Sequence, residues 1–508
     1  MVCTDSHSRI KNMPVSVFLL LTDWLCRTRG SAHLAALMIG LFYALSSNAV
    51  LAASMYLPLS MQPNIERKVD KLFVLADMPI IKRPIPISQI RLAVEKTRTT
   101  APQLSSDVDA YLQRFNRGLG FTHLSVKANL DQSENDYSVP NSYGLLSSSK
   151  YHLGLGAYAT LGDWAIVNIA ENYNSGNNQT RTDLQHHSFI SLGTPLAQLD
   201  IGYRPHWLGP FKDSDMLIST NAQTMPGITL SNTKAFNMFG IDTYYELFLL
   251  KMSESSLIRS TRDLTQVKRG SPRLFGTHLS FQPFSGFAIG FNRLMQFGGG
   301  DRDDRAGSVA EAFFVPRDAD NIDDEGRDFG NQLSSITTRY TFPGTFPISA
   351  YMEFAGEDTS ASSRYHLGNT AVMFGVHLPE VLNHLDIRYE TAEWQNLWYV
   401  NANYGDGLTN YEGIVGHWGA ERRRFSDGVG ARADTLSISY EHSSRDNIVA
   451  TFRRLENAEP RGSNYETSRE IDLSYTRKWQ DSLIELNAVF GESVFGESYH
   501  RLTVGFRW

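Results

Sequence analysis

The chain has 508 residues, with 47 Lys and Arg against 54 Asp and Glu, which gives a formal net charge of −7. This mild acidity argues against nucleic acid as the main partner, because a phosphate-binding surface normally shows a basic excess or stripe. Aromatic residues and glycine are frequent, with 28 Phe, 22 Tyr, 8 Trp and 39 Gly. That mixture is typical of large antiparallel sheets rather than of helical bundles.

The first 53 residues have the features of a secretory signal. Basic residues at Arg27 and Arg29 precede the apolar run HLAALMIGLFYALSSNAVLAA, which ends in small residues. We therefore expect residues 1–53 to direct Sec-type export and to be cleaved after Ala52 or Ala53. The alternative is an uncleaved anchor in the inner membrane, but the polar residues SSN shorten the apolar part below the ~20 residues that a spanning helix needs.

Both cysteines, Cys3 and Cys26, lie upstream of the expected cleavage site. The mature chain would therefore contain no disulfide and no cysteine-based metal site. The residues before Cys26 are not the small residues that precede a lipidated cysteine, so a lipoprotein is not expected.

Residues 54–118 differ from the rest of the chain, because their apolar residues recur at helical spacing. The run NIERKVDKLFVLA predicts one helix, with Asn64 as its N-cap. A proline-rich break follows at 78–86, and two more helices are expected after Ser88 and after Ser106 or Asp107. Each helix is too short to persist alone in water, so we expect a small packed domain, periplasmic or plugging a barrel.

From Phe121 onward, apolar and polar residues alternate with a period of two. This period indicates β-strands, because successive side chains of a strand point to opposite faces. One face is apolar or aromatic, and the other carries Asp, Arg, Glu, His and Ser. The alternating segments include 199–203, 275–281, 287–291, 348–354, 372–378, 385–389, 436–440, 448–452, 471–475 and 484–490.

The last nine residues, HRLTVGFRW, form another two-faced strand. Leu502, Val504, Phe506 and Trp508 share one face, opposite Arg501, Thr503, Gly505 and Arg507. An outer-membrane barrel ends on such a strand because its last strand pairs with the first. A β-sandwich could show similar strands, but the export signal, the aromatic terminus and the number of strands favour an all-β transmembrane antiparallel barrel over 119–508.

At roughly 20 residues per strand and connection, the alternating region gives on the order of 18 strands. Two polar stretches, 298–332 and 401–434, are too long to be tight turns. Long loops of such barrels lie on the outer side and short turns on the periplasmic side, so we expect these stretches to be extracellular.

The sequence contains no G-x-S-x-G, H-E-x-x-H, P-loop or G-x-G-x-x-G motif, so we expect no catalysis and no cofactor. An acidic run resembles a calcium loop and comprises Asp318, Asp320, Asp323, Asp324 and Glu325. Ile322 occupies a ligand position, which favours a solvated acidic loop without metal. His186 and His187 are adjacent, so in a strand they would point to opposite faces and would not share a metal.

Aromatic residues crowd into one stretch, and three arginines follow it. The stretch contains Trp394, Trp398, Tyr399, Tyr404, Tyr411 and Trp418, followed by Arg422, Arg423 and Arg424. Aromatic faces stack on the C–H faces of sugar rings, while arginine holds hydroxyl and carboxylate groups, so these residues are candidate polysaccharide contacts. Alternatively, the first three aromatic residues belong to a membrane-interface girdle and the arginines bind lipopolysaccharide phosphate.

The segment YRPHWLGPFKDSDMLISTNAQTMPGITLSN at 203–232 resembles the Wzi family of outer-membrane capsule assembly proteins. Further similarity lies in MYLPLS after the signal, in RGSPRLFGTHLSFQP followed by GFNRLMQFGGG, and in YGDGLTNYEGIVGHW. The resemblance covers nearly the whole mature chain. It implies an 18-stranded barrel with a periplasmic helical domain, and lectin-like attachment of capsular polysaccharide without catalysis.

We therefore expect a non-enzymatic outer-membrane barrel whose external loops bind capsular or related acidic polysaccharide. The other expected partners are outer-membrane lipid and lipopolysaccharide, and the protein is expected to be a monomer. Two rival functions stay open at this point. One is a porin-like channel for small solutes or saccharides, favoured by the charged inner faces, and the other is a membrane-embedded hydrolase, for which the sequence shows no nucleophile motif.

Overall fold

The computed structural model describes residues 53–508 except 134, 176–179, 184–185, 306–329, 358–367, 382–383, 421–427 and 459–464. The expected signal, apart from residue 53, and the acidic run at 318–325 therefore lie outside the described residues. None of the helices in the described part has the length and apolar character needed to cross a membrane.

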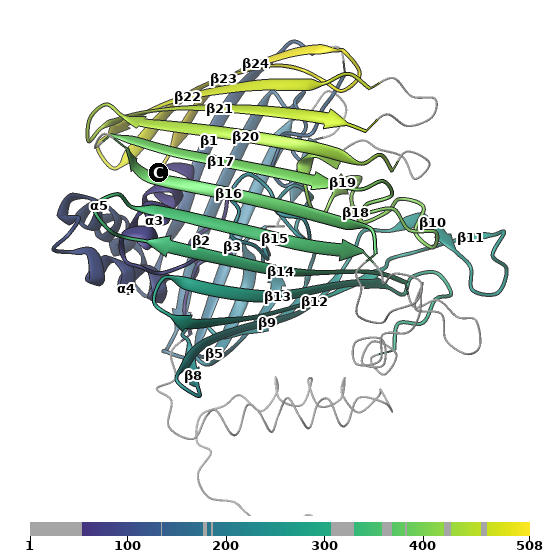
Figure 1. The fold of residues 1–508 in the computed structure, drawn as a ribbon, viewed down its shortest axis with the longest axis horizontal. Helices are drawn as coiled ribbons and strands as arrows, with labels where there is room; N and C mark the ends of the chain where they lie inside the picture. Colours follow the sequence, from purple (N-terminus) through teal and green to yellow (C-terminus); the bar gives the residue numbers. More distant parts are fainter. Residues whose placement is uncertain are drawn as a thin grey trace, which may run out of the picture.

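The described strands form a closed antiparallel barrel (Figure 1). Its sheet contains 20 strand segments, but β4 and β5 both pair with β3, and β7 and β8 both pair with β9. Each of these pairs of segments is one interrupted strand, so the wall has 18 strands. This confirms the all-β transmembrane fold and the strand number expected from the sequence.

The wall is built in chain order, with each strand paired to the next. Its segments are β1 (Leu119–Asp131), β2 (Tyr151–Leu161), β3 (Ala165–Ser175), β4 (Thr180–Asp183), β5 (Ser188–Thr194), β6 (Ala197–Tyr203), β7 (Gly227–Ser231), β8 (Phe236–Met238), β9 (Ile241–Lys251), β12 (Arg273–Phe284), β13 (Phe287–Phe297), β14 (Gly330–Phe342), β15 (Ile348–Glu357), β16 (Thr370–Val381), β17 (Leu385–Trp394), β20 (Ala431–Glu441), β21 (Asp446–Asn457), β22 (Ser468–Trp479), β23 (Ser482–Glu492) and β24 (Ser498–Arg507).

The barrel closes between its first and last strands. β24 pairs antiparallel with β1, and the register places Phe506 opposite Val126 and Leu502 opposite Leu130. On the inner face, the Thr503 hydroxyl donates to Asn129 Oδ1 at 2.8 Å. The two-faced terminal strand predicted from the sequence is therefore the strand that closes the wall.

Side chains of the wall alternate between the lumen and the outside. Leu130, Ile169 and Val504 are 73%, 57% and 58% exposed, whereas the neighbouring Thr503 is 6% exposed. Apolar residues thus cover the outer surface, and polar residues are buried on the inside. In lipid, a closed barrel with an apolar outer wall satisfies every backbone hydrogen bond of the sheet.

A charge on this outer wall should oppose assembly. We expect Val504→Lys to cost about 2–3 kcal/mol of folding free energy, because a cation would face hydrocarbon near the middle of β24. The measurement is the folded fraction in urea, followed by the heat-dependent gel migration of the barrel, with Val504→Leu as the matched control. Unchanged stability of Val504→Lys would show that this face of β24 does not contact lipid.

Aromatic residues mark one end of the outer wall. They lie at the short turns that join neighbouring strands, and the exposed ones are Trp164, Phe239, Phe284, Phe342, Phe346 and Trp479. We call this the short-turn end, and the opposite end, with the connections 132–150, 252–272 and 395–430, the long-loop end. We call these exposed aromatic residues the short-turn belt. Amphipathic aromatic side chains concentrate at membrane–water interfaces, so the short-turn belt indicates that one interface lies at the level of these turns.

Three helices and a single turn of 3₁₀-helix cover the short-turn end (Figure 1). They are α3 (Pro63–Leu75), α4 (Ile87–Thr97), α5 (Pro102–Leu112) and η1 (Gln113–Phe115). The expected N-caps differ from those observed, because α3 and α5 each begin at a proline, a residue whose fixed φ suits the first helical turn. Asn64, the expected cap, instead donates to Thr476 of the wall at 2.8 Å.

The apolar faces of the helices form one core with the barrel end. Val69, Leu72, Ile90 and Val108 are fully buried there and pack with Tyr158 of β2. Charged side chains add contacts to the wall, since Asp70 accepts from Arg388 of β17 at 3.2 Å. The helices are therefore docked on the barrel and depend on it for burial of their apolar faces.

Residues 204–226, the inner segment, connect β6 to β7 by folding into the barrel. Most of its side chains are buried, and Leu208, Phe211 and Met216 are fully covered. Leu208 O accepts from Asn292 of β13 at 3.0 Å, while Arg339 of β14 donates to Pro210 O at 3.1 Å. The inner segment thus fills the lumen with a second apolar core, held by polar contacts to the wall.

Small sheets extend the long-loop end. β10 (Ser255–Arg259) pairs with β11 (Val267–Gly270), and β18 (Thr409–Asn410) pairs with β19 (Gly413–Ile414), followed by η2 (Trp418–Ala420). The Ser219 backbone N–H donates to Val415 O at 2.9 Å and joins the β17–β20 connection to the inner segment. The described part of this long connection is therefore folded against the barrel interior.

Candidate functional site

The structure separates the aromatic residues of the β17–β20 region into two groups. Trp394, Trp398 and Tyr404 are 3%, 3% and 2% exposed, and Tyr399 is equally buried. Their ring faces are covered by protein, so they neither offer a surface to a sugar ring nor lie in the membrane-interface girdle. Tyr399 shows what they do instead, because its hydroxyl donates to Met216 O at 2.6 Å and fixes the inner segment.

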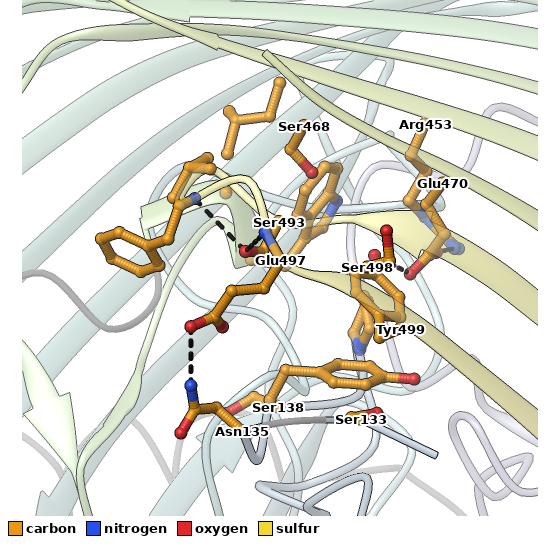
Figure 2. Close-up of a pocket in the computed structure, with 17 residues that line it drawn as sticks. Ser133, Asn135, Ser138, Arg453, Ser468, Glu470, Ser493, Glu497, Ser498 and Tyr499 are labelled. Atoms are coloured by element: carbon orange, nitrogen blue, oxygen red, sulfur yellow. Dashed lines mark hydrogen bonds and ion pairs between the residues drawn. The ribbon is translucent and has the colours of Figure 1, made fainter. Parts of the chain in front are cut away.

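Two predicted contact residues have accessible side chains. Tyr411, 47% exposed, lies in the turn between β18 and β19, and Trp418 is half-buried in η2. The predicted contacts Arg422, Arg423 and Arg424 lie outside the described residues. Of the predicted residues that the structure describes, Trp418 is the one that lines a cavity shown in Figure 2.

Figure 2 shows the cavity in close-up. It lies at the long-loop end and has a volume of about 130 Å³. Its wall combines the β1–β2 and β23–β24 connections, η2 and the inner faces of β21, β22 and β24. The lining residues are Ser133, Asn135, Tyr137, Ser138, Pro140, Trp418, Gly419, Arg453, Leu455, Ser468, Glu470, Ser493, Val494, Phe495, Glu497, Ser498 and Tyr499. The cavity is thus rich in aromatic rings and in hydroxyl, amide and carboxyl groups.

A pair of tyrosines forms one side of the cavity. The ring centroids of Tyr137 and Tyr499 are 4.2 Å apart, with an angle of 39° between the ring planes. Burial raises the pKa of the Tyr137 phenol above its ordinary value, so the hydroxyl stays protonated. Its oxygen is buried and has no hydrogen-bond partner among the described residues, which leaves a donor available to a ligand.

Asp213 of the inner segment fixes the other side of the cavity. One carboxylate oxygen accepts from Trp418 Nε1 and from the Thr435 hydroxyl, both at 2.8 Å. The other accepts from Arg453 Nη2 at 2.9 Å and Nε at 3.0 Å. A carboxylate holding an indole and a guanidinium at once sets the orientation of both side chains.

The network continues from Arg453 to the tyrosine pair. Arg453 Nη1 donates to Glu470 Oε1 at 2.5 Å, and the Tyr499 hydroxyl donates to Glu470 Oε2 at 2.9 Å. At the rim, Asn135 Nδ2 donates to Glu497 Oε1 at 2.6 Å and joins two connections (Figure 2). Arg453 is shared between two carboxylates, so its positive charge is already neutralised. The cavity therefore offers a ligand hydrogen-bond acceptors rather than a free cation.

A metal centre is not formed within the described part of the chain, where no three His, Cys, Asp or Glu side chains gather closely enough to hold an ion. His186 and His187 differ from expectation, since the positive φ of His187, 70°, turns the backbone out of an extended strand. Both rings then lie against Tyr143, with centroids 4.2 and 5.9 Å away. They are packing groups in the barrel interior.

Trp418 was a candidate from the sequence alone, whereas its neighbours in the cavity were not. Tyr137, Arg453 and Tyr499 come from three distant parts of the chain, and Asp213 comes from a segment without strand periodicity. The alternation of β21 did signal that Arg453 lies on the polar inner face, opposite Phe452. These residues meet at one cavity because the wall closes and because residues 204–226 fold into the barrel.

Comparison with known proteins decides the family. A sequence model of the family described as Capsule assembly protein Wzi matches residues 124–495. The chain belongs to the Wzi family. This confirms the resemblance to the Wzi family found in the sequence, and the apolar outer wall and closed barrel fit the expected location in the outer membrane.

Two relatives of this Wzi-family chain illustrate its divergence. A Klebsiella pneumoniae protein described as an uncharacterized 55.8 kDa protein in the cps region is 23% identical over 282 residues. The match covers 54% of this chain and 53% of that protein, so the chain spans about half the length of the curated relative it matches.

The second relative is a solved structure from Escherichia coli. It is Wzi, described as an outer membrane protein involved in group 1 capsule assembly and as a carbohydrate-binding β-barrel. The TM-score is 0.65 at 14% sequence identity, and the superposition covers 90% of this chain and 99% of that one. At this identity the likeness establishes the shared barrel fold.

Proposed function

We propose that the cavity around Trp418 binds a sugar unit of capsular polysaccharide and thereby attaches the polymer to the cell surface, without catalysis. The observation that carries this proposal is the Trp418 ring, fixed by Asp213 beside the closely spaced, mutually tilted rings of Tyr137 and Tyr499. Fixed aromatic rings bind the C–H faces of sugars at little entropic cost. The carbohydrate binding ascribed to the Escherichia coli protein supports the same assignment.

The charges of the cavity favour an uncharged sugar unit. Arg453 is shared between Asp213 and Glu470, and Glu497 adds a further carboxylate at the rim. Such acceptors suit hydroxyl donors and would repel a uronate placed at the same point. We infer that an acidic polymer presents one of its neutral units here, while its carboxylates lie elsewhere.

We also propose that the helices face the periplasm and that the long-loop end faces outward, next to lipopolysaccharide. Short turns of outer-membrane barrels are periplasmic, and the helices cover that end. A monomer suits a wall that closes on itself, because the described strands of the barrel sheet leave no open edge to pair with another copy.

The rival channel function is disfavoured by the inner segment. Leu208, Phe211, Met216 and Leu217 are fully buried inside the barrel, where an open pore would hold water. A large steady conductance in a planar bilayer would contradict a lumen filled in this way. No observation in the described residues favours the hydrolase.

Binding of purified protein to capsular polysaccharide from the encoding strain tests the proposed site. We expect Trp418→Ala to weaken binding about fivefold, because loss of one stacking ring removes about 1 kcal/mol. Tyr411→Ala is the matched control, since Tyr411 belongs to the same connection but does not line the cavity. Weaker binding by the Tyr411 variant alone would move the binding face to the β18–β19 turn.

A further inference from the structure

A second cavity lies at the opposite end of the barrel, where the helices meet the closing strands. Its volume is about 620 Å³, and it is lined by α3, α5, η1, the start of β1, the β22–β23 turn and Trp508. It is separate from the cavity around Trp418, because the two lie at opposite ends of the wall. Its position beside the outer wall raises the question of which ligand it could hold.

Uncompensated positive charge gathers in this second cavity. Lys68 pairs with Asp107, and Arg507 pairs with Glu485 at 2.6 Å. The remaining lining cations are Arg114, Arg117 and Lys478, for which no ion pair occurs among the described residues, and Asp481 is the one further acidic side chain of the lining. The cavity therefore has a local excess of positive charge in a chain that is acidic as a whole.

Arg114 is held in place rather than free in solvent. Its guanidinium lies over the ring of Tyr111 at 4.0 Å and over the ring of Trp508 at 4.6 Å. Nη1 donates to Thr122 O at 3.2 Å, while Nε is buried and has no hydrogen-bond partner. A buried donor on a fixed guanidinium suits an oxyanion, for which arginine has a strong geometric preference.

The other side of the cavity faces the membrane. Leu119 and Phe121 line it and are 71% and 52% exposed on the outer surface of β1. Lys478 directly precedes Trp479, a member of the short-turn belt that is 60% exposed. The cations thus lie at the level of the membrane interface, with apolar side chains beside them at the hydrocarbon boundary.

We propose that this cavity binds the phosphate-bearing headgroup of an anionic phospholipid from the leaflet at the short-turn end. Arg114, Arg117 and Lys478 hold the phosphate, and the acyl chains lie along Leu119 and Phe121 on the outside of β1. The bound lipid spans the place where β1 and β24 close the wall and where η1 docks. This combination of phosphate and acyl-chain contacts distinguishes a phospholipid from free phosphate.

Native mass spectrometry of the full chain in detergent with added phosphatidylglycerol tests the proposal. We expect one tightly retained lipid per chain and about 30-fold weaker retention by Arg117→Gln/Lys478→Gln, because each interfacial cation contributes to attraction of anionic lipid. The matched control is Lys96→Gln/Arg98→Gln, which removes two exposed charges of the helical region outside the cavity.

The outcomes separate lipid binding from simpler explanations. Equal retention of phosphatidylglycerol by both double variants would overturn the proposal. Displacement of the lipid by equimolar glycerol phosphate would also overturn it, because the site would then recognise phosphate without the acyl chains. If Arg117→Gln/Lys478→Gln does not assemble, the single variant Arg117→Gln is compared with the control instead, since Arg117 is exposed.

Discussion

Asp70→Asn is expected to lower the free energy of unfolding by about 3–5 kcal/mol, the usual cost of leaving buried charges without their partner. Asp70 is fully buried in α3. Its carboxylate accepts from Arg83 Nη2 at 2.7 Å and from Arg388 Nη2 at 3.2 Å, so it joins the helices to β17. The asparagine would leave two buried guanidinium groups next to an uncharged amide.

This contribution should depend on pH. Burial by itself would raise the pKa of Asp70, but the Arg83 and Arg388 guanidinium groups outweigh burial and hold the pKa well below its usual range. A carboxyl whose pKa is lowered by folding stabilises the folded protein at any pH above the carboxyl's ordinary pKa. This stabilisation is lost as the pH falls from the ordinary pKa toward the lowered pKa of the folded state. The variant should therefore lose less stability than the wild type between about pH 5 and pH 2.

Urea unfolding in detergent micelles at several pH values measures both effects. Glu95→Gln, which changes an exposed carboxylate of α4, should alter stability by less than about 0.5 kcal/mol. Equal stabilities for Asp70→Asn and Glu95→Gln at neutral pH would show that the buried ion pairs do not hold the helices on the barrel.

Asp213→Asn should reduce both stability and polysaccharide binding. Its carboxylate holds Trp418 Nε1, the Thr435 hydroxyl and Arg453, and an amide can accept at only one of its two terminal atoms. We expect a loss of about 3 kcal/mol, since Glu470 still compensates Arg453. Binding should fall more than tenfold, because the orientation of the cavity is lost together with that of Trp418.

Isothermal titration with the polysaccharide and urea unfolding of the same variant separate these two effects. Asp163→Asn, in the exposed β2–β3 turn at the other end of the barrel, is the control and should leave binding and stability unchanged. A variant at Asp213 that binds normally would show that the cavity is not the polysaccharide site.

Much of the wall could be predicted from the sequence because its signal is local. The alternation around Val504 already indicated which side chains face outward, and the export signal and strand number indicated a barrel. The path of residues 204–226 could not be predicted, because a chain that fills a lumen has no periodicity of its own. Its burial depends on a wall formed by residues far away.

The aromatic stretch shows a different limit. Its composition suggested sugar contacts, yet Trp394 points inward with Glu390 and Ala392, opposite the exposed Tyr389. Counting in steps of two from Tyr389 would have given this orientation. Trp418 has no strand partner to count from, so its accessibility and its bond to Asp213 required the three-dimensional structure.

The inward fold of residues 204–226 also bears on the order in which the molecule forms. Asp213 bonds Thr435 across 222 positions of the chain and Arg453 across 240, and Gln62 bonds Trp508 across 446. The entropy of closing such long loops opposes these contacts until neighbouring strands have paired. The cavity around Trp418 therefore forms late in folding, after most of the wall, because its residues are spread along the chain from Ser133 to Tyr499.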